Sequence, residues 1–397
     1  MTATRFTAAV VLAQILAQIG AYTLPALLPI YIARWSLSAT EAGWLIGAFF
    51  AAYVFAVPLL VALTDRVPAR RVYLLGTALT ALSHLGFALL ADGFWSALAL
   101  RAMAGVGWAG CYMPGLKVIA DRQEGTAQSR AVTWHAAGVG IAGAASFAVA
   151  GSLDSLAGPA AAFLFGAAAA AMAFAIGAAV MPAEAPRRVA GAVAPAALLD
   201  FRPVLRNRAA MAWIVGYTVH TWELAALRAW AVTFLTVTIA SHGAPAWLPG
   251  PAVIFTLVGL VGIAVSVTGN ETAQRFGRAR VVAAAMGAGA VLAFVTGWSA
   301  AISAPLAVVC VLLWNAAIYL DSSALTAGTV KAAAPGMRGA TMGLHSMCGY
   351  AGGFLGPVGV GLMLDIAGHD AWGPAFGHIA IVTLIGLFLM RRLNRLA

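Results

Sequence analysis

The sequence predicts an all-α membrane protein with twelve transmembrane helices in two pseudo-symmetric six-helix bundles. Three observations lead to this fold class. The 397 residues are 62% hydrophobic and only 9% charged, whereas soluble domains carry about 25% charged residues. Apolar runs repeatedly reach the roughly 20 residues that an α-helix needs to cross the hydrocarbon core. A short charged segment also occurs twice, at corresponding points of the two halves.

Each long apolar run defines one span. The first run exceeds the apolar region of a signal peptide and many others follow it, so we interpret it as a helix of the mature fold. The predicted spans cover residues 8–33, 41–63, 72–91, 94–119, 130–152, 157–180, 209–238, 249–269, 281–299, 302–328, 339–364 and 371–390.

The longest interruption, residues 181–208, contains four prolines and five arginines and separates six spans from six. We therefore predict an N-terminal six-helix bundle at 1–180, a cytoplasmic linker at 181–208 and a C-terminal six-helix bundle at 209–397.

The duplicated charged segment is VALTDRVPARR at residues 61–71 and NETAQRFGRAR at residues 270–280. At a constant offset of 209, Arg66 aligns with Arg275, and Gly277 stands at the position of Pro68. Two related charged turns at the same point of each half indicate an internal duplication.

The first copy resembles the signature loop between helices 2 and 3 of the major facilitator superfamily, G-x-L-a-D-R-x-G-R-R/K. Span 4 carries RAMAGVG from Arg101, which is similar to the R-x-x-x-G-x-G pattern of that family's helix 4. The resemblance implies two six-helix bundles around a central cavity lined by helices 1, 4, 7 and 10. It also implies a cytoplasmic conformational latch made of Asp65, Arg66, Arg70 and Arg71.

The basic residues indicate the orientation. With the N-terminus in the cytoplasm, 19 of the 23 Lys and Arg residues fall on cytoplasmic segments, one lies on the opposite side and three lie within spans. This distribution follows the positive-inside rule. It explains the net charge of +10 without a nucleic-acid partner. We expect a multi-pass protein of the inner (plasma) membrane with both termini in the cytoplasm.

Ionisable side chains inside a bilayer are costly and by default mark function. Five lie clearly within spans, all on spans that the resemblance places around the cavity. They are Arg101 and Lys117 on span 4, Glu223 and Arg228 on span 7, and Asp321 on span 10.

Span 7 offers the richest site. His220 lies about 17 Å from the inner end of the helix, and Glu223 follows three residues later. The protonation of the two groups would be mutually dependent, which suits proton coupling. Alternatively, Glu223 pairs with a basic residue of another helix and only stabilises the bundle. Arg101 has two interpretations as well. It takes part in substrate binding or proton coupling, as the resemblance to some family antiporters implies, or it is a structural partner of backbone carbonyls or of Glu223.

Two polar stripes are further candidates for cavity lining. Asn315 and Tyr319 share a face of span 10, and Gln14, Gln18 and Tyr22 follow one another on span 1 at i, i+4 and i+8. Hydrogen bonding between helices is the alternative role for each of them.

Lysine and histidine recur near the predicted cytoplasmic ends of both halves. Lys117 is followed by His135, and Lys331 is followed by His345. Two such pairs predict an anion-attracting cytoplasmic vestibule. The alternative is that the lysines, at helix ends, only extend their ammonium groups toward water.

These features predict a secondary active transporter that works by alternating access. The sequence has no ATP-binding P-loop, so an ion gradient is the expected energy source. Because three of the five embedded charges are positive, we expect proton-coupled transport of a small anion or polar metabolite, and the chain is similar to the family's nitrate- and cyanate-type carriers. The alternative is multidrug or hydrophobic compound efflux by proton antiport, with Glu223 and Asp321 serving a cationic substrate.

Other function classes find less support. The chain has no HExxH motif or metal-ligand cluster and no appended signalling domain, so neither a membrane enzyme nor a sensor is expected. The three cysteines fall in apolar runs and predict no disulfide or metal site. We expect a monomer without cofactor or metal, whose partners are a small-molecule substrate, protons and the lipid bilayer.

Overall fold

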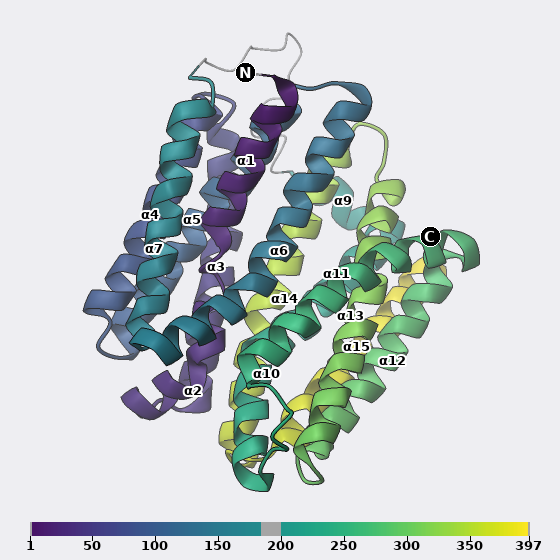
Figure 1. The fold of residues 1–397 in the computed structure, drawn as a ribbon. Coiled ribbons are helices and arrows are strands. Elements are labelled where there is room, and N and C mark those ends of the chain that lie inside the picture. The colour runs from purple at the N-terminus through teal and green to yellow at the C-terminus, as the bar shows by residue number, and fades with distance from the viewer. Residues whose placement is uncertain (1, 184–199, 396–397) are drawn as a thin grey trace. The chain divides into compact units, whose positions relative to one another are not determined.

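The computed structural model describes residues 2–183 and 200–395 (Figure 1). These residues form fourteen helices and no strand. The bounds are α1 Ala3–Gln18, α2 Thr23–Trp35, α3 Ala39–Leu63, α4 Ala69–Leu90, α5 Phe94–Ala120, α6 Gly125–Ala157, α7 Pro159–Val180, α9 Arg202–Arg206, α10 Arg208–His242, α11 Pro251–Phe276, α12 Arg278–Ser299, α13 Ala304–Ala332, α14 Arg338–Ala367 and α15 Trp372–Arg395.

Every predicted span is helical, which confirms the all-α fold class. Eleven stretches of the described residues are long and apolar enough to cross a membrane, with α1 and α2 counted as one. The remaining predicted span, 94–119, forms α5, whose 27 residues are long enough to cross. It carries the predicted embedded cations Arg101 and Lys117. Of the predicted linker, residues 184–199 lie outside the described residues and α9 occupies part of the rest.

The first predicted span is two helices instead of one. The α-helix stops after Gln18 and resumes at Thr23, with Gly20 in the intervening turn. Pro25 favours this break because its ring would clash with the carbonyl of residue 21 in a continuous helix. The regular helical spacing that related Tyr22 to Gln14 and Gln18 is therefore interrupted after Gln18, and a shared polar face for the three residues stays a prediction.

The internal duplication is visible in the helices that follow the two charged turns. The helices α4 and α12 are both 22 residues long and begin at Ala69 and Arg278, which are 209 residues apart. Each is preceded by a residue that interrupts the helical backbone, Pro68 in the first copy and Gly277 in the second. Gly277 has a φ of +92°, a conformation that favours glycine.

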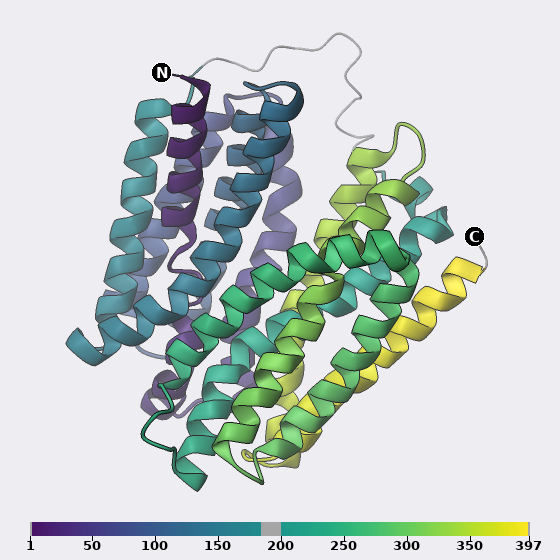
Figure 2. The same ribbon diagram turned by 45° about the vertical axis from the view of Figure 1, so that its right-hand side comes forward.

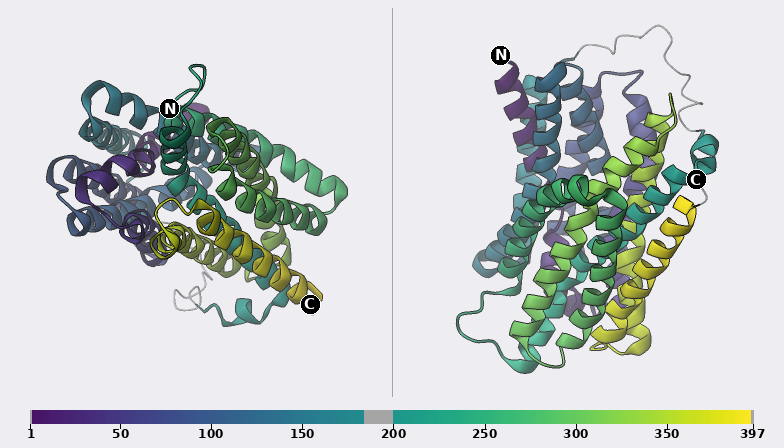
Figure 3. Two further views of the ribbon diagram at one scale, coloured as in Figure 1. Left: turned by 90° about the horizontal axis from the view of Figure 1, so that it is seen from below. Right: turned by 90° about the vertical axis from the view of Figure 1, so that its right-hand side faces the viewer.

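The described residues form two compact units, one of residues 2–27 and 48–183 and the other of residues 28–47 and 200–395. The boundary between 183 and 200 lies within the predicted linker, but residues 28–47 pack with the second unit. In the first unit, α4 packs on α5 and α7, and α1 packs on α6 and α7. In the second, α12 packs on α13 and α15 (Figure 2), and α15 also packs along α10 (Figure 3).

Small residues on α14 allow it to approach α10 closely. A Cβ atom at Gly352 would lie 2.1 Å from the carbonyl oxygen of Thr218, and one at Gly356 would lie 2.2 Å from that of Trp222. Neither position can accept a side chain unless the backbones separate. The contact is the close helix packing that the GxxxG spacing permits.

Within the second unit, α14 also anchors the start of α3. The carboxylate of Asp365 accepts hydrogen bonds from the backbone N–H groups of Ala39, at 2.9 Å, and Thr40, at 2.7 Å. Ser38 and Glu41 form a capping box, since each side chain accepts from the backbone N–H of the other. Four N–H groups of a helix start lack partners within the helix, and here side chains from two helices supply acceptors.

Candidate functional site

A buried pair of ionisable side chains joins α10 to α13. His220 Nδ1 lies 2.7 Å from Asp321 Oδ1. Both residues are only 3% exposed. The sequence placed both within the membrane on neighbouring cavity helices, and the structure brings them into direct contact.

Glu223, almost one turn along α10, is equally buried but contacts other groups. Its carboxylate accepts a hydrogen bond from Trp314 Nε1, at 2.5 Å, and a longer one from Thr383 Oγ1, at 3.4 Å. A Cβ atom at Gly289 of α12 would lie 2.8 Å from it. Among the residues that the structure places, no basic side chain forms an ion pair with Glu223, so its contacts differ from the pairing considered as an alternative.

Aromatic rings extend this cluster to α14. The rings of Tyr217 and His345 stack with their centroids 3.8 Å apart, and Tyr217 also stacks on His220 at 5.8 Å. His345 Nδ1 lies 3.0 Å from Thr329 Oγ1. His345 thus belongs to the cluster of α10 and α13. Its ring contacts Tyr217 and Thr329, and Lys331, with which it was predicted to form a vestibule, is not one of these partners.

A second pair of polar residues lies on the more accessible side of α10. The guanidinium of half-buried Arg228 donates a hydrogen bond to Tyr319 Oη and lies 5.7 Å from the centroid of that ring. Asn315 instead donates to the backbone carbonyl of Val258 on α11, at 2.8 Å. This contact is the interhelical hydrogen bond that was the alternative to cavity lining for Asn315.

In the first unit, Arg101 and Gln18 are also buried. Arg101 is 3% exposed, and its Cζ atom lies 5.0 Å from the centroid of the Phe49 ring. Gln14 and Gln18 are fully buried, and within residues 2–183 and 200–395 the oxygen and nitrogen of both side-chain amides lack hydrogen-bond partners. Buried amides are normally paired, so this face of α1 is suited to a polar ligand or water.

Lys117 and His135, the predicted vestibule residues of the first unit, have different partners. Lys117 Nζ lies 2.7 Å from Asp65 Oδ1 and also donates to Thr64 Oγ1. His135 is buried and stacks on Tyr112, with centroids 5.4 Å apart. Lys117 is thus joined to the latch and His135 to Tyr112, and the cytoplasmic vestibule stays a prediction.

The four latch residues differ in their surroundings. Asp65 contacts the end of α5 through Lys117. Arg70 Nη2 donates to the carbonyl oxygen of Ala178, near the end of α7, at 2.5 Å. Arg66 and Arg71 are exposed. The turn is thus connected to α5 and α7, and its role as a conformational latch stays a prediction.

Several residues of the cluster were not predicted as site residues. Trp314, Thr383 and Gly289 all contact the Glu223 carboxylate, and nothing in the sequence marks Thr383 or Gly289 because isolated threonines and glycines are common in apolar helices. Among the described residues, no group of three or more His, Cys, Asp or Glu side chains could hold a metal ion.

Comparisons with known proteins agree with this architecture. Solved structures with the same fold include the nucleoside transporter NupG, with a TM-score of 0.79 at 15% identity over 99% of both chains. A bacterial homologue of the human lysosomal transporter Spinster gives 0.81 at 16% identity over 99% of this chain and 97% of that chain. A POT family transporter in complex with 5-aminolevulinic acid gives 0.77 at 12% identity, over 98% and 96%. A search of the curated proteins found no match. The family model of the Major Facilitator Superfamily matches residues 10–357, and the chain belongs to this family.

Proposed function

We propose that this chain is a proton-coupled secondary transporter of a small anionic or polar solute, with its coupling site at His220, Asp321 and Glu223. The observation that carries the proposal is the buried contact of His220 with Asp321, 2.7 Å apart. Membership of the family supports transport by alternating access. The coupling ion and the substrate class are inferred from the charges of the cluster.

The His220–Asp321 pair is suited to hold a transported proton. One proton shared between the imidazole and the carboxyl group leaves the pair neutral, and one more makes it cationic. A net charge that is buried without a counter-charge is costly. The second proton is therefore best accommodated when an anion binds nearby, so the two ligands bind cooperatively by linkage. Glu223 adds a third titratable group next to the pair, with neutral donors as its partners.

The half-buried Arg228 supports an anionic or polar substrate. Its guanidinium lies on the more accessible side of α10, eight residues from His220. Arginine favours carboxylate and phosphate groups because it presents several N–H donors in one plane. Arg101, Gln18 and Tyr319 are proposed as further contacts, whereas the narrower similarity to nitrate- and cyanate-type carriers stays a prediction.

The topology is part of the same proposal. We place both termini in the cytoplasm and the protein in the inner membrane, because the predicted cytoplasmic segments carry 19 of the 23 basic residues. Two six-helix halves, at 1–180 and 209–397, rock about the substrate in this proposal. The protein acts as a monomer.

The test uses purified protein in proteoliposomes that contain an internal pH-sensitive dye. Small anions are added first, one at a time, and wild type is compared with Asp321→Asn and Glu223→Gln. We expect an anion to acidify the lumen together with its own uptake, and we expect Asp321→Asn to abolish proton movement. Glu223→Gln keeps an oxygen acceptor for Trp314 and therefore separates loss of a titratable group from loss of a structural contact.

The result also separates the alternative function. Proton movement driven by lipophilic cations, and by no anion, would replace this proposal with efflux by proton antiport. Unchanged proton movement in both variants, at equal amounts of folded protein, would show that these acids have no role in coupling.

A further inference from the structure

Two adjoining pockets lie among α10, α11, α12 and α13 of the second unit, and neither is lined by His220 or Asp321. The larger has a volume of about 630 Å³, and the smaller has about 530 Å³. Both are lined by Arg278 and Lys331, so we refer to them together as the Arg278–Lys331 pocket. The other polar lining residues of the larger part are Asn270, Ser322, Ser323 and Thr326.

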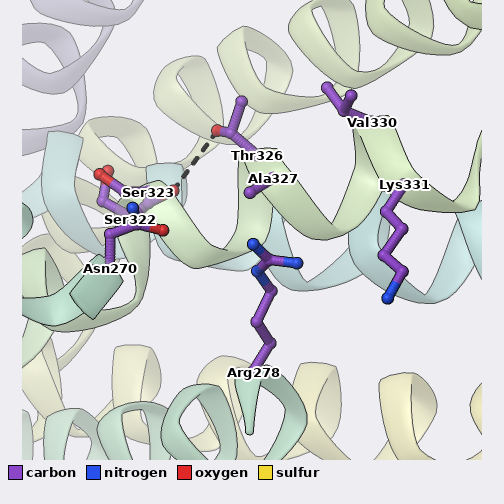
Figure 4. A pocket seen from close by; sticks show the side chains of 8 residues that line it. All are labelled: Asn270, Arg278, Ser322, Ser323, Thr326, Ala327, Val330 and Lys331. Atoms are coloured by element: carbon purple, nitrogen blue, oxygen red, sulfur yellow. Dashed lines mark hydrogen bonds between the residues drawn. The ribbon is translucent and has the colours of Figure 1, made fainter. Parts of the chain in front are cut away.

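Two cations point into this pocket from different helices. In Figure 4 the guanidinium of Arg278 extends from α12 toward α13, and the side chain of Lys331 extends from α13 into the same space. The side chains of Asn270 and Ser322 lie beyond Arg278, at the opposite end from Lys331. The pocket therefore combines two positive charges with neutral hydrogen-bonding groups.

Neither cation is compensated by the residues that the structure places. Within the part of the chain that the structure describes, the side chains of Arg278 and Lys331 form no ion pair and no hydrogen bond. Arg278 Nε is buried and lacks an acceptor. An unpaired buried donor is costly, and an anion in the pocket would supply the missing acceptor.

The two copies of the charged turn differ in the charges that they place near this pocket. At the offset of 209, Gln274 stands where the first copy has Asp65, and Arg278 stands where it has Ala69. In the first unit Asp65 pairs with the lysine near the end of α5. In the second unit Lys331, near the end of α13, faces a pocket lined by Gln274 instead. The second copy thus has a neutral amide in place of the acid, and it carries one of its three arginines at position 278, whereas the first copy carries one at position 70.

We propose that the Arg278–Lys331 pocket binds a phosphate group, carried by the headgroup of an anionic lipid or by a soluble phosphate. A guanidinium can contact two phosphate oxygens at once, and a lysine adds a point charge. The nearby hydroxyl and amide groups can donate to the remaining oxygens. Basic pockets between membrane helices are a known kind of headgroup site. This site is separate from the proposed transport site and does not depend on it.

The experiment measures binding to purified full-length protein in detergent. One arm titrates phosphatidylglycerol, with phosphatidylcholine as the net-neutral lipid, and follows bound lipid by native mass spectrometry. The other arm titrates inorganic phosphate and follows the melting temperature. The test variant is Arg278→Gln/Lys331→Gln. The matched control is Arg275→Gln/Arg280→Gln, which removes two charges from the same turn at positions that do not line the pocket.

We expect the pocket variant to bind its ligand at least tenfold more weakly than wild type, and the control to change by less than about twofold. Selective loss of phosphatidylglycerol binding identifies a lipid headgroup, and selective loss of the phosphate response identifies a soluble anion. Equal binding by all three proteins in both arms would overturn the proposal, as would equal losses in the pocket variant and the control.

A second variant avoids removing any cation. Gln274→Asp restores the acid that the first copy has at Asp65 and should let it pair with Lys331. We expect this single change to weaken phosphate-group binding severalfold without lowering the melting temperature of the ligand-free protein. Undiminished binding in a folded Gln274→Asp protein would count against the pocket as the site.

Discussion

The buried contact between His220 and Asp321 gives the sharpest stability prediction. At 2.7 Å, two unit charges attract by about 6 kcal/mol at an effective dielectric constant of 20. Burial of both groups offsets several kcal/mol of this attraction. We therefore expect His220→Gln and Asp321→Asn each to cost about 3 kcal/mol of unfolding free energy, because each strands a buried polar partner. The double variant should cost about 2 kcal/mol less than the sum of the two.

The assay is unfolding by sodium dodecyl sulfate in mixed micelles, followed by tryptophan fluorescence. The pair of Asp65 and Lys117 supplies the matched control, since it has the same 2.7 Å separation but side chains that are 48% and 29% exposed. Exposed pairs contribute about 0.2–1 kcal/mol, so the corresponding cycle should give a much smaller coupling. The reasoning is refuted if the His220–Asp321 cycle is additive within about 0.5 kcal/mol.

Three further predictions concern packing and the latch. Gly356→Ala should destabilise the protein by about 1–3 kcal/mol because the added Cβ atom would meet a backbone carbonyl. Gly287→Ala is the control, since a Cβ atom there would meet nothing within 4 Å. Equal melting temperatures of the two variants would contradict the packing argument. Asp365→Ala should remove about 1 kcal/mol of capping energy and increase hydrogen exchange at the start of α3, whereas unchanged exchange would show that the cap is dispensable. Asp65→Lys should slow transport in proteoliposomes, with little loss of stability, and Lys117→Asp in the same protein should restore the rate; failure of the charge swap to rescue would exclude this ion pair from the transport cycle.

Much of the fold could be predicted because it follows from solvation. A segment that crosses a bilayer must satisfy its backbone hydrogen bonds internally, so long apolar runs form helices. The register of the duplication was equally readable, since a fixed offset of 209 relates the starts of α4 and α12. The turn after Gln18 was not predicted because the hydropathy of a segment carries no information on local backbone geometry. Gly20 and Pro25 were the residues that could have indicated a break in the helix.

Within the candidate site, the type of residue was more predictable than its partner. His220, Glu223 and Asp321 stand out in the sequence because an ionisable side chain is costly to bury in a membrane span, and few such side chains occur within spans. Which of them touch depends on helix rotation and on side-chain rotamers, and these are set by packing across several helices. Glu223 illustrates the limit, since its partners Trp314 and Thr383 are 91 and 160 residues away.

The two copies of the charged turn have kept one backbone plan and diverged in electrostatics. In the first copy an acid at position 65 neutralises Lys117 and ties the turn to α5, so the contact must break whenever these helix ends separate. In the second copy Gln274 cannot neutralise Lys331, and that lysine shares a pocket with Arg278. The Asp65–Lys117 contact as a conformational latch stays a prediction for the first unit. If the Arg278–Lys331 pocket binds an anion as proposed, that anion would supply the corresponding restraint in the second unit, which would make the motion of that half sensitive to its surroundings.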